Sequence, residues 1–232
     1  PLFFDAEVSP REASVLRPSQ EVFEDLARRG NLVPVVREIM ADHDTPLSLF
    51  RRLDDGRTSF LFESVEGGEK WARYSFLGSG ARALFRARGS DVEWTERGHS
   101  VRSRAPGDPL EMLRARLASV RAVAPEGADL PRFLGGAVGM VGYDWVRFVE
   151  RIPDENPDEV GMPDLWFMLP ETVVVFDNVR HTVKIVICSR PAESASPEAA
   201  LARAAAEIEG LEHTLRQPPE PVPLTQGSRI AF

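Results

Sequence analysis

The chain has 232 residues, of which 43% are hydrophobic, enough for the core of one large domain or two small ones. Its 36 acidic and 28 basic side chains give a net charge of −8 without a long Lys/Arg run, which argues against binding to nucleic acid. The apolar runs are too short to span a bilayer, no secretory leader is visible, and the single Cys188 excludes an intrachain disulfide. We therefore expect a cytoplasmic protein with no membrane contact.

The first elements expected along the chain are two helices separated by a strand. Ser19 can cap a short amphipathic helix that ends at Gly30, and residues 32–40 are expected to be extended. Pro46 fits the first position of a second helix, which runs to about Leu53 before a turn.

The middle of the chain is rich in strand-forming residues. Residues 58–104 contain aromatic and branched runs broken by glycines, which predicts a meander of antiparallel hairpins. Asp108 begins a capping-box pattern, so residues 110–120 should be helical. Residues 133–145 are rich in glycine but lack the spacing of a nucleotide-binding loop. A buried strand with close backbone approach suits them better.

The last third of the chain predicts three strands, one long helix and a connector. Residues 165–169 form a short apolar run, and residues 172–176 should pair with residues 182–188 across a turn. Ser196 precedes the longest helix, and residues 217–223 contain four prolines, typical of a connector to another domain. Because the strands cluster between helices, the fold class is α+β, with antiparallel β-sheets and packed helices.

Catalytic and metal-binding patterns are missing from most of the sequence. The four histidines lie far apart, and we expect structural or solvated roles for them: His43, His99, His181 and His213. Acidic residues gather between positions 144 and 159, but without the ligand spacing of a calcium loop, so a solvated loop is the better interpretation. We assign no catalytic residue and no metal ligand to this chain.

The most informative segment, residues 60–68, places Glu63 and Ser64 in an apolar, aromatic-rich strand. A buried carboxylate needs a cation, several hydrogen bonds or a raised pKa. An ion pair with Arg73, a strand edge open to water, or the ammonium of a ligand would each meet that need. In a regular strand Glu63 and Ser64 would face opposite sides, so the strand ends here or one residue acts through its backbone. Leu61 would share the side of Glu63 and offer an apolar wall to a hydrophobic amino acid.

Several segments together resemble anthranilate synthase component I. The strongest is residues 61–68 (Leu-Phe-Glu-Ser-Val-Glu-Gly-Gly), followed by residues 73–78 (Arg-Tyr-Ser-Phe-Leu-Gly). Further matches are residues 34–38, 44–46, 135–139 with 142–144, 163–168, and 175–178 with 181–182. Together the matches cover nearly the whole chain in order.

The resemblance implies that the Leu-Leu-Glu-Ser segment of that family, part of its feedback site for tryptophan, corresponds here to Leu61, Glu63 and Ser64. Phe62 replaces the second Leu and keeps the position apolar. Glu63 would meet the tryptophan ammonium and Ser64 would supply a hydrogen bond, while Arg73 balances Glu63 when the site is empty. The family's second tryptophan-contacting segment, Asn-Pro-Ser-Pro-Tyr-Met, is absent from this sequence.

The resemblance also implies that residues 1–215 are the N-terminal regulatory domain and that residues 216–232 lead toward a C-terminal catalytic domain. The complete enzyme would convert chorismate to anthranilate and pyruvate, with magnesium bound by the missing domain and ammonia from a glutamine amidotransferase subunit. This piece alone is expected to be inactive. The fold would form part of a layered α/β/β/α sandwich.

Two alternatives stay open at this point. Aminodeoxychorismate synthase is a close relative with similar architecture, and its component I would share many of these segments. The other alternative is a free-standing β-rich binding or scaffold module without chorismate chemistry, in which Glu63 forms a structural ion pair.

Overall fold

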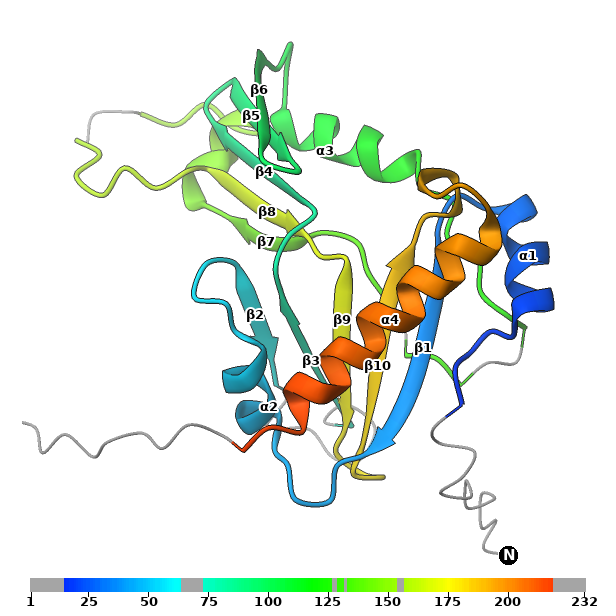
Figure 1. The fold of residues 1–232 in the computed structure, drawn as a ribbon. Helices are drawn as coiled ribbons and strands as arrows, with labels where there is room; N and C mark the ends of the chain where they lie inside the picture. Colours follow the sequence, from blue (N-terminus) through cyan, green and yellow to red (C-terminus); the bar gives the residue numbers. More distant parts are fainter. Residues whose placement is uncertain (1–14, 64–72, 127–128, 132, 154–156, 219–232) are drawn as a thin grey trace, which may run out of the picture.

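A computed structural model of the chain describes residues 15–63, 73–126, 129–131, 133–153 and 157–218 (Figure 1). The α-helices are α1 (Gln20–Arg29), α2 (Pro46–Leu53), α3 (Pro109–Ala118) and α4 (Pro197–Leu215), and two short 3₁₀ helices are η1 (Tyr143–Phe148) and η2 (Pro191–Glu193). The strands are β1 (Val33–Met40), β2 (Ser59–Phe62), β3 (Tyr74–Ser79), β4 (Ala83–Arg88), β5 (Asp91–Glu96), β6 (His99–Arg104), β7 (Val138–Val141), β8 (Leu165–Leu169), β9 (Thr172–Asp177) and β10 (Thr182–Ser189).

The described strands form two antiparallel five-stranded sheets, which confirms the α+β class. The first sheet has the order β1-β10-β9-β3-β2 and the second β6-β5-β4-β8-β7. The predicted pairing of residues 172–176 with residues 182–188 is confirmed, and Val173 lies opposite Val186. Strand β1 completes this edge of the first sheet by pairing along its whole length with β10.

The prediction that residues 58–104 form a single meander is wrong in one respect, because the strands of this segment divide between the two sheets. Strands β2 and β3 belong to the first sheet, whereas β4, β5 and β6 belong to the second. The chain changes sheets at Gly80, whose φ of +73° favours glycine and whose N–H donates to the Thr58 carbonyl at 2.8 Å. The change of sheet depends on pairing with β8 and β9, which lie about 80 to 100 residues further along the chain.

The helices begin where the sequence predicts, although their caps differ in detail. Thr45 and Ser48 form a reciprocal capping box at α2, and the Ser196 hydroxyl accepts a hydrogen bond from Ala199 N–H at α4. Asp108 caps α3 by accepting from Leu110 N–H, so the predicted reciprocal box is replaced by a single bond. The Ser19 side chain makes no cap bond to α1.

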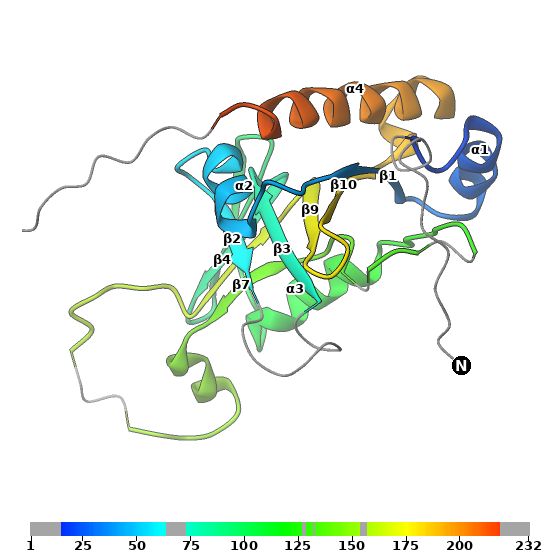
Figure 2. The ribbon, with the colours of Figure 1, turned by 90° about the horizontal axis from the view of Figure 1, so that it is seen from below.

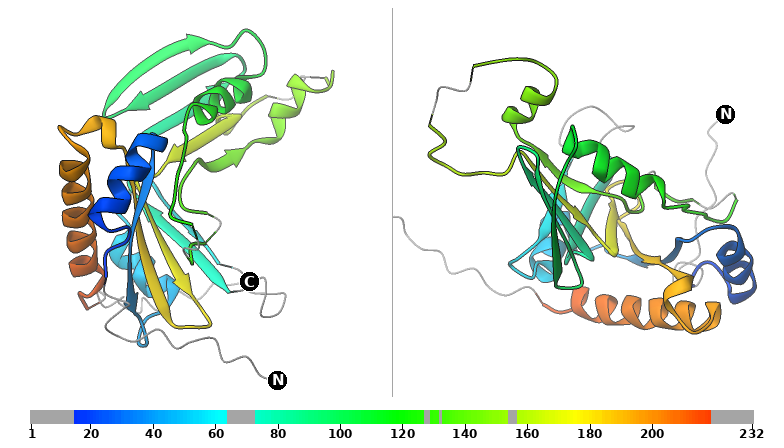
Figure 3. Two further views of the ribbon diagram at one scale, coloured as in Figure 1. Left: turned by 90° about the vertical axis from the view of Figure 1, so that its right-hand side faces the viewer. Right: turned by 90° about the horizontal axis from the view of Figure 1, so that it is seen from above.

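The first sheet carries packed side chains on both faces. Helices α1, α2 and α4 cover one face, where Phe23, Leu49 and Ile208 are buried against the sheet. Figure 2 shows α4 on one side of this sheet and α3 on the other, and the left view of Figure 3 shows α1 and α4 on the same side. The opposite face buries Val36, Val173, Val175 and Val186, packed against Leu130, Phe133 and Leu134.

The glycine-rich segment 133–145 forms strand β7 and the turn into η1. A Cβ at Gly139 would lie 1.9 Å from the Trp166 carbonyl oxygen, so the predicted close backbone approach is confirmed. Full burial is not found, because β7 is an edge strand in which only Val138 is buried. Among the described residues, no helix has the length and hydropathy needed to cross a membrane. Most of the predicted connector, residues 219–223, lies outside the described residues.

Candidate functional site

Leu61 and Glu63 lie at the end of β2 where the chain leaves the strand toward β3. Leu61 pairs with Leu77 and Phe62 with Phe76, and β2 ends at Phe62. Glu63 is therefore the first residue beyond the strand, so strand alternation no longer sets its direction. Ser64 lies outside the described residues.

The expected burial of Glu63 is not found, because its side chain is exposed in the structure. Its carboxylate can be hydrated here, and the argument that burial forces a partner on it does not hold for this chain. The reason is the early end of β2, which carries Glu63 past the last strand pair, Phe62 with Phe76. What stays in place is an accessible carboxylate directly after an exposed aromatic residue in the chain.

The apolar residues of β2 divide between the two faces of the first sheet. Leu61 is half-buried and packs against the core beneath the helices. Phe60 is buried on the other face, where its ring lies 5.5 Å from that of Phe62, measured between centroids. Because Phe62 is 52% exposed, it offers an aromatic surface next to Glu63 at the edge of the sheet.

Arg73 forms its ion pair with Asp177 and not with Glu63, which corrects the expected pairing. Its Nε and Nη2 atoms donate to Asp177 Oδ2 at 3.0 and 2.8 Å. These hydrogen bonds are the main cause of the raised pKa of Arg73. Asp177 is only 2% exposed, and its Oδ1 accepts from the N–H groups of Val179 and Arg180 in the turn between β9 and β10.

The same turn also fixes the backbone at the start of β3. Asn178 donates to the Arg73 carbonyl from its backbone N–H at 2.8 Å and from its side-chain Nδ2 at 3.2 Å. Its side chain also donates to Ser75 Oγ at 3.1 Å. The Arg73 guanidinium lies 4.9 Å from the centroid of the Tyr74 ring, at cation–π distance. The hairpin thus has a fixed point at Arg73, ten residues beyond Glu63.

A second group of charges extends from this turn across the first sheet. Lys184 is 3% exposed and donates to the Asp129 carbonyl at 2.7 Å and to its Oδ2 at 3.1 Å. Arg180 donates to the same carboxylate at 2.9 Å. Burial acts to raise the pKa of Asp129, but the hydrogen bond and the positive charges of Lys184 and Arg180 outweigh it, so the pKa is lowered. This group holds residues 129–131 over the valine-rich face of the sheet.

Neither charge group has the composition of a catalytic centre. Within the described residues, no three His, Cys, Asp or Glu side chains lie together as metal ligands would. Glu63 offers an exposed carboxylate directly after Phe62 in the chain.

Sequence reasoning missed the Asp177 and Lys184 groups because their partners lie far apart in the chain. Asp177 and Arg73 are separated by 104 positions, and Lys184 and Asp129 by 55. One local signal was present: an Asp-Asn pair directly after an apolar strand indicates a turn whose carboxylate accepts backbone N–H groups. The cation that pairs with this carboxylate, Arg73, is brought near it by the pairing of strands that are distant in the sequence, which a local pattern does not reveal.

Comparison with known proteins places the chain in a family. A family model described as "chorismate binding enzyme" matches residues 59–231. The chain is 41% identical over 206 residues to anthranilate synthase component 1 of Pseudomonas putida, an alignment that covers 88% of this chain and 41% of that protein. The chain is 38% identical over 203 residues to the protein of the same name from Acinetobacter calcoaceticus, and this alignment covers 84% of this chain and 39% of that protein. The chain thus spans about two fifths of the length of these relatives.

A solved structure supports the same fold. The crystal structure of anthranilate synthase component I from Streptococcus pneumoniae TIGR4 superimposes with a TM-score of 0.50 at 22% sequence identity, covering 78% of this chain and 37% of that one. At this identity the match speaks for the fold alone. Because the family model covers most of the sequence, the chain belongs to the chorismate binding enzyme family.

Proposed function

We propose that this chain is the N-terminal, tryptophan-sensing part of an anthranilate synthase component I. The observation that carries the proposal is the continuous similarity to proteins of that name over 84% and 88% of the chain at 38% and 41% identity. The complete enzyme would convert chorismate, with ammonia derived from glutamine, to anthranilate and pyruvate. The relatives' shared name favours this activity over that of aminodeoxychorismate synthase.

The proposed tryptophan contacts are Leu61, Glu63 and Ser64. Glu63 is exposed and directly follows Phe62, whose ring is also exposed, so an ammonium group can reach the carboxylate. We assign Arg73 an indirect role: its bond to Asp177 fixes the strand that follows the binding segment. A second part of the protein would complete the site and bury the ligand.

Such a shared site gives feedback inhibition a physical basis. Tryptophan that contacts both parts binds best when they adopt one relative orientation, and its binding energy then favours that orientation. A coupling of about 1–3 kcal/mol changes the equilibrium constant between the two arrangements roughly 5- to 150-fold. Magnesium would be held by the part of the protein that carries the active site, and a glutamine amidotransferase subunit would supply ammonia.

The reaction itself is tested by product identification. The complete protein, given chorismate, magnesium and ammonium, should form fluorescent anthranilate with release of pyruvate. The 232-residue chain alone should form neither product. Formation of aminodeoxychorismate by the complete protein would replace the proposed reaction, and turnover by the short chain would place the active site within it.

A further inference from the structure

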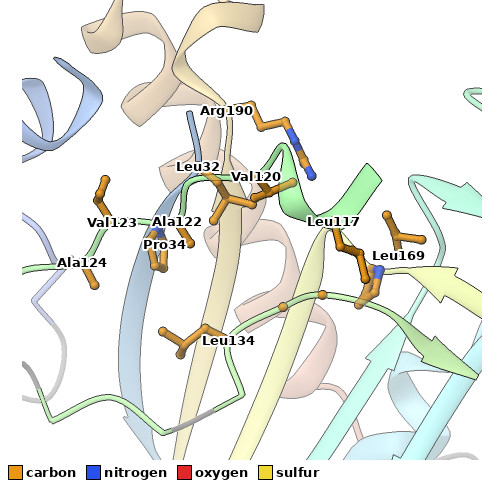
Figure 4. Close-up of a pocket in the computed structure, with 13 residues that line it drawn as sticks. Leu32, Pro34, Leu117, Val120, Ala122, Val123, Ala124, Leu134, Leu169 and Arg190 are labelled. Carbon is orange, nitrogen blue, oxygen red and sulfur yellow. The ribbon is translucent and has the colours of Figure 1, made fainter. Parts of the chain in front are cut away.

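An apolar pocket lies at the edge of the first sheet formed by β1, opposite to the edge that carries Glu63. It has a volume of about 460 Å³ and is bounded by the start of β1, the chain after α3, the glycine segment before β7 and the end of β8 (Figure 4). Among the described lining residues, Arg190 alone has a polar side chain. The apolar wall includes Leu32, Pro34, Leu117, Leu134 and Leu169.

Arg190 brings a guanidinium with an unsatisfied hydrogen-bond donor to this pocket. Its Nη1 atom is buried and has no hydrogen-bond partner within the described residues. Burial is the main cause of the lowered pKa of Arg190, and the positive charge of Arg82 adds to it. A buried guanidinium N–H without an acceptor carries a free-energy cost that a bound acceptor would remove.

The carboxylates of Glu171 and Glu193, whose charges act on Arg190, bond to Arg82 instead. Arg82 Nη1 donates to Glu171 Oε1 and to Glu193 Oε2, both at 3.0 Å. Both carboxylates act on Arg190 through charge at longer range. Figure 4 shows the Arg190 side chain reaching toward Val120 and Leu117 on the pocket wall.

The pocket wall is fixed by hydrogen bonds before any ligand arrives. Asn31 donates from Nδ2 to the Ser119 carbonyl at 2.8 Å, and its Oδ1 accepts from Arg121 N–H at 2.6 Å. The backbone of Leu32 also forms hydrogen bonds with the chain after α3: its N–H donates to the Arg121 carbonyl at 3.3 Å, and its carbonyl accepts from Val123 N–H at 3.0 Å. A preformed wall lowers the entropy cost of binding.

We propose that this pocket binds a small apolar carboxylate, whose carboxyl group pairs with Arg190 and whose hydrocarbon body lies against the leucines. A guanidinium binds a carboxylate through two parallel N–H···O bonds, and those bonds are strongest where water is excluded. The apolar walls offer no hydrogen bond to a polar body, so they favour an aryl or alkyl group. The proposal does not depend on the tryptophan site, which lies at the other edge of the sheet.

The test uses 4-phenylbutyrate as the probe and 4-phenylbutyramide as its uncharged match. Calorimetry with the 232-residue chain should show that the carboxylate binds at least about ten-fold more tightly than the amide. In Arg190→Met this preference should disappear, whereas Arg104→Met, which removes an exposed arginine on β6, should keep it. Leu117→Trp should weaken the binding of both probes, because the larger side chain fills the pocket.

Thermal unfolding of the free variants separates binding from a structural role. If Arg190 is held unpaired for a ligand, Arg190→Met should melt at the same or a higher temperature than the parent chain, and the probe should no longer raise it. Equal affinity for carboxylate and amide, or unchanged binding in Arg190→Met, would overturn the proposal. So would an absence of binding by the parent chain. If Arg190→Met does not fold, Arg190→Gln serves in the same comparison.

Discussion

Arg73 and Asp177 join the start of β3 to the end of the neighbouring strand β9, two positions that are 104 residues apart in the sequence. The guanidinium donates twice to one carboxylate oxygen, and the other oxygen accepts two backbone N–H groups of the turn. With Asp177 only 2% exposed, its charge depends on these four donors. The bond therefore holds β3 against the β9–β10 turn, directly after the segment proposed to bind tryptophan.

Replacing Arg73 by Met should destabilise the chain by about 2–3 kcal/mol. Breaking a buried ion pair typically costs about 3–5 kcal/mol, because one charge is left without a partner. The lower value applies because the Arg73 side chain is 31% exposed, so water can partly replace it. Urea unfolding of the parent and variant chains measures the difference.

A double-mutant cycle with Asp177→Asn is the control for this prediction. Asparagine keeps an oxygen for the turn and removes the charge, so adding Arg73→Met to Asp177→Asn should cost much less than it does in the parent chain. Equal costs in both backgrounds would show that the two side chains do not depend on each other.

Alanine substitution of two glycines should have opposite effects. Gly139→Ala would place a Cβ 1.9 Å from the Trp166 carbonyl oxygen, and we expect a loss of about 2 kcal/mol or more as β7 shifts away from β8. Gly210 lies inside α4, where an added Cβ meets no atom within 4 Å. There alanine should stabilise by about 0.5–1 kcal/mol through its higher helix propensity. Chemical denaturation of both variants tests the contrast, and a tolerated Gly139→Ala would contradict the close approach.

Acid should weaken the contact between η2 and the second sheet. Burial acts to raise the pKa of Glu193, but its hydrogen bond with Arg82 and the charges of Arg82 and Arg97 outweigh this and lower the pKa below 4.5. A carboxyl group whose pKa is lower in the folded than in the unfolded state stabilises the fold at pH values above its unfolded-state pKa. That contribution is lost as the pH falls through the folded pKa.

The matching experiment compares Glu193→Gln with the parent chain at pH 7 and below pH 4. The variant should be less stable at pH 7, and the difference should shrink as the pH falls. Glu150→Gln, which alters an exposed carboxylate after η1, should show no such trend. A constant difference between Glu193→Gln and the parent at both pH values would rule out a role for its ionisation.

The helices and most strand boundaries could be predicted because their signals are local. Thr45 with Pro46 and Ser196 with Pro197 combine a capping side chain with a proline that suits the first helical turn. Strands 165–169 and 172–177 are short apolar runs with a turn between them. Each of these patterns needs only a few neighbouring residues.

The division into two sheets and the charge pairs could not be predicted in the same way. Whether β3 pairs with β9 or continues the hairpins of β4 and β5 depends on distant strands, and Gly80 indicates a turn without saying which sheet follows. Glu63 was expected to be buried because its neighbours are aromatic, but β2 ends one residue before it. Arg190 gave no sequence signal, since its isolation results from Arg82 holding both nearby carboxylates.

The most direct test of the account is a tryptophan titration of anthranilate formation by the complete enzyme carrying Glu63→Gln or Ser64→Ala. Glu111→Gln, an exposed change on α3, is the matched control. We expect each site variant to require at least about ten-fold more tryptophan for half-inhibition, because an ammonium or hydrogen-bond contact worth about 1.5 kcal/mol or more is lost. The control should behave like the parent enzyme. Unchanged inhibition in both site variants, with anthranilate formation intact, would contradict the assignment of tryptophan sensing to this segment.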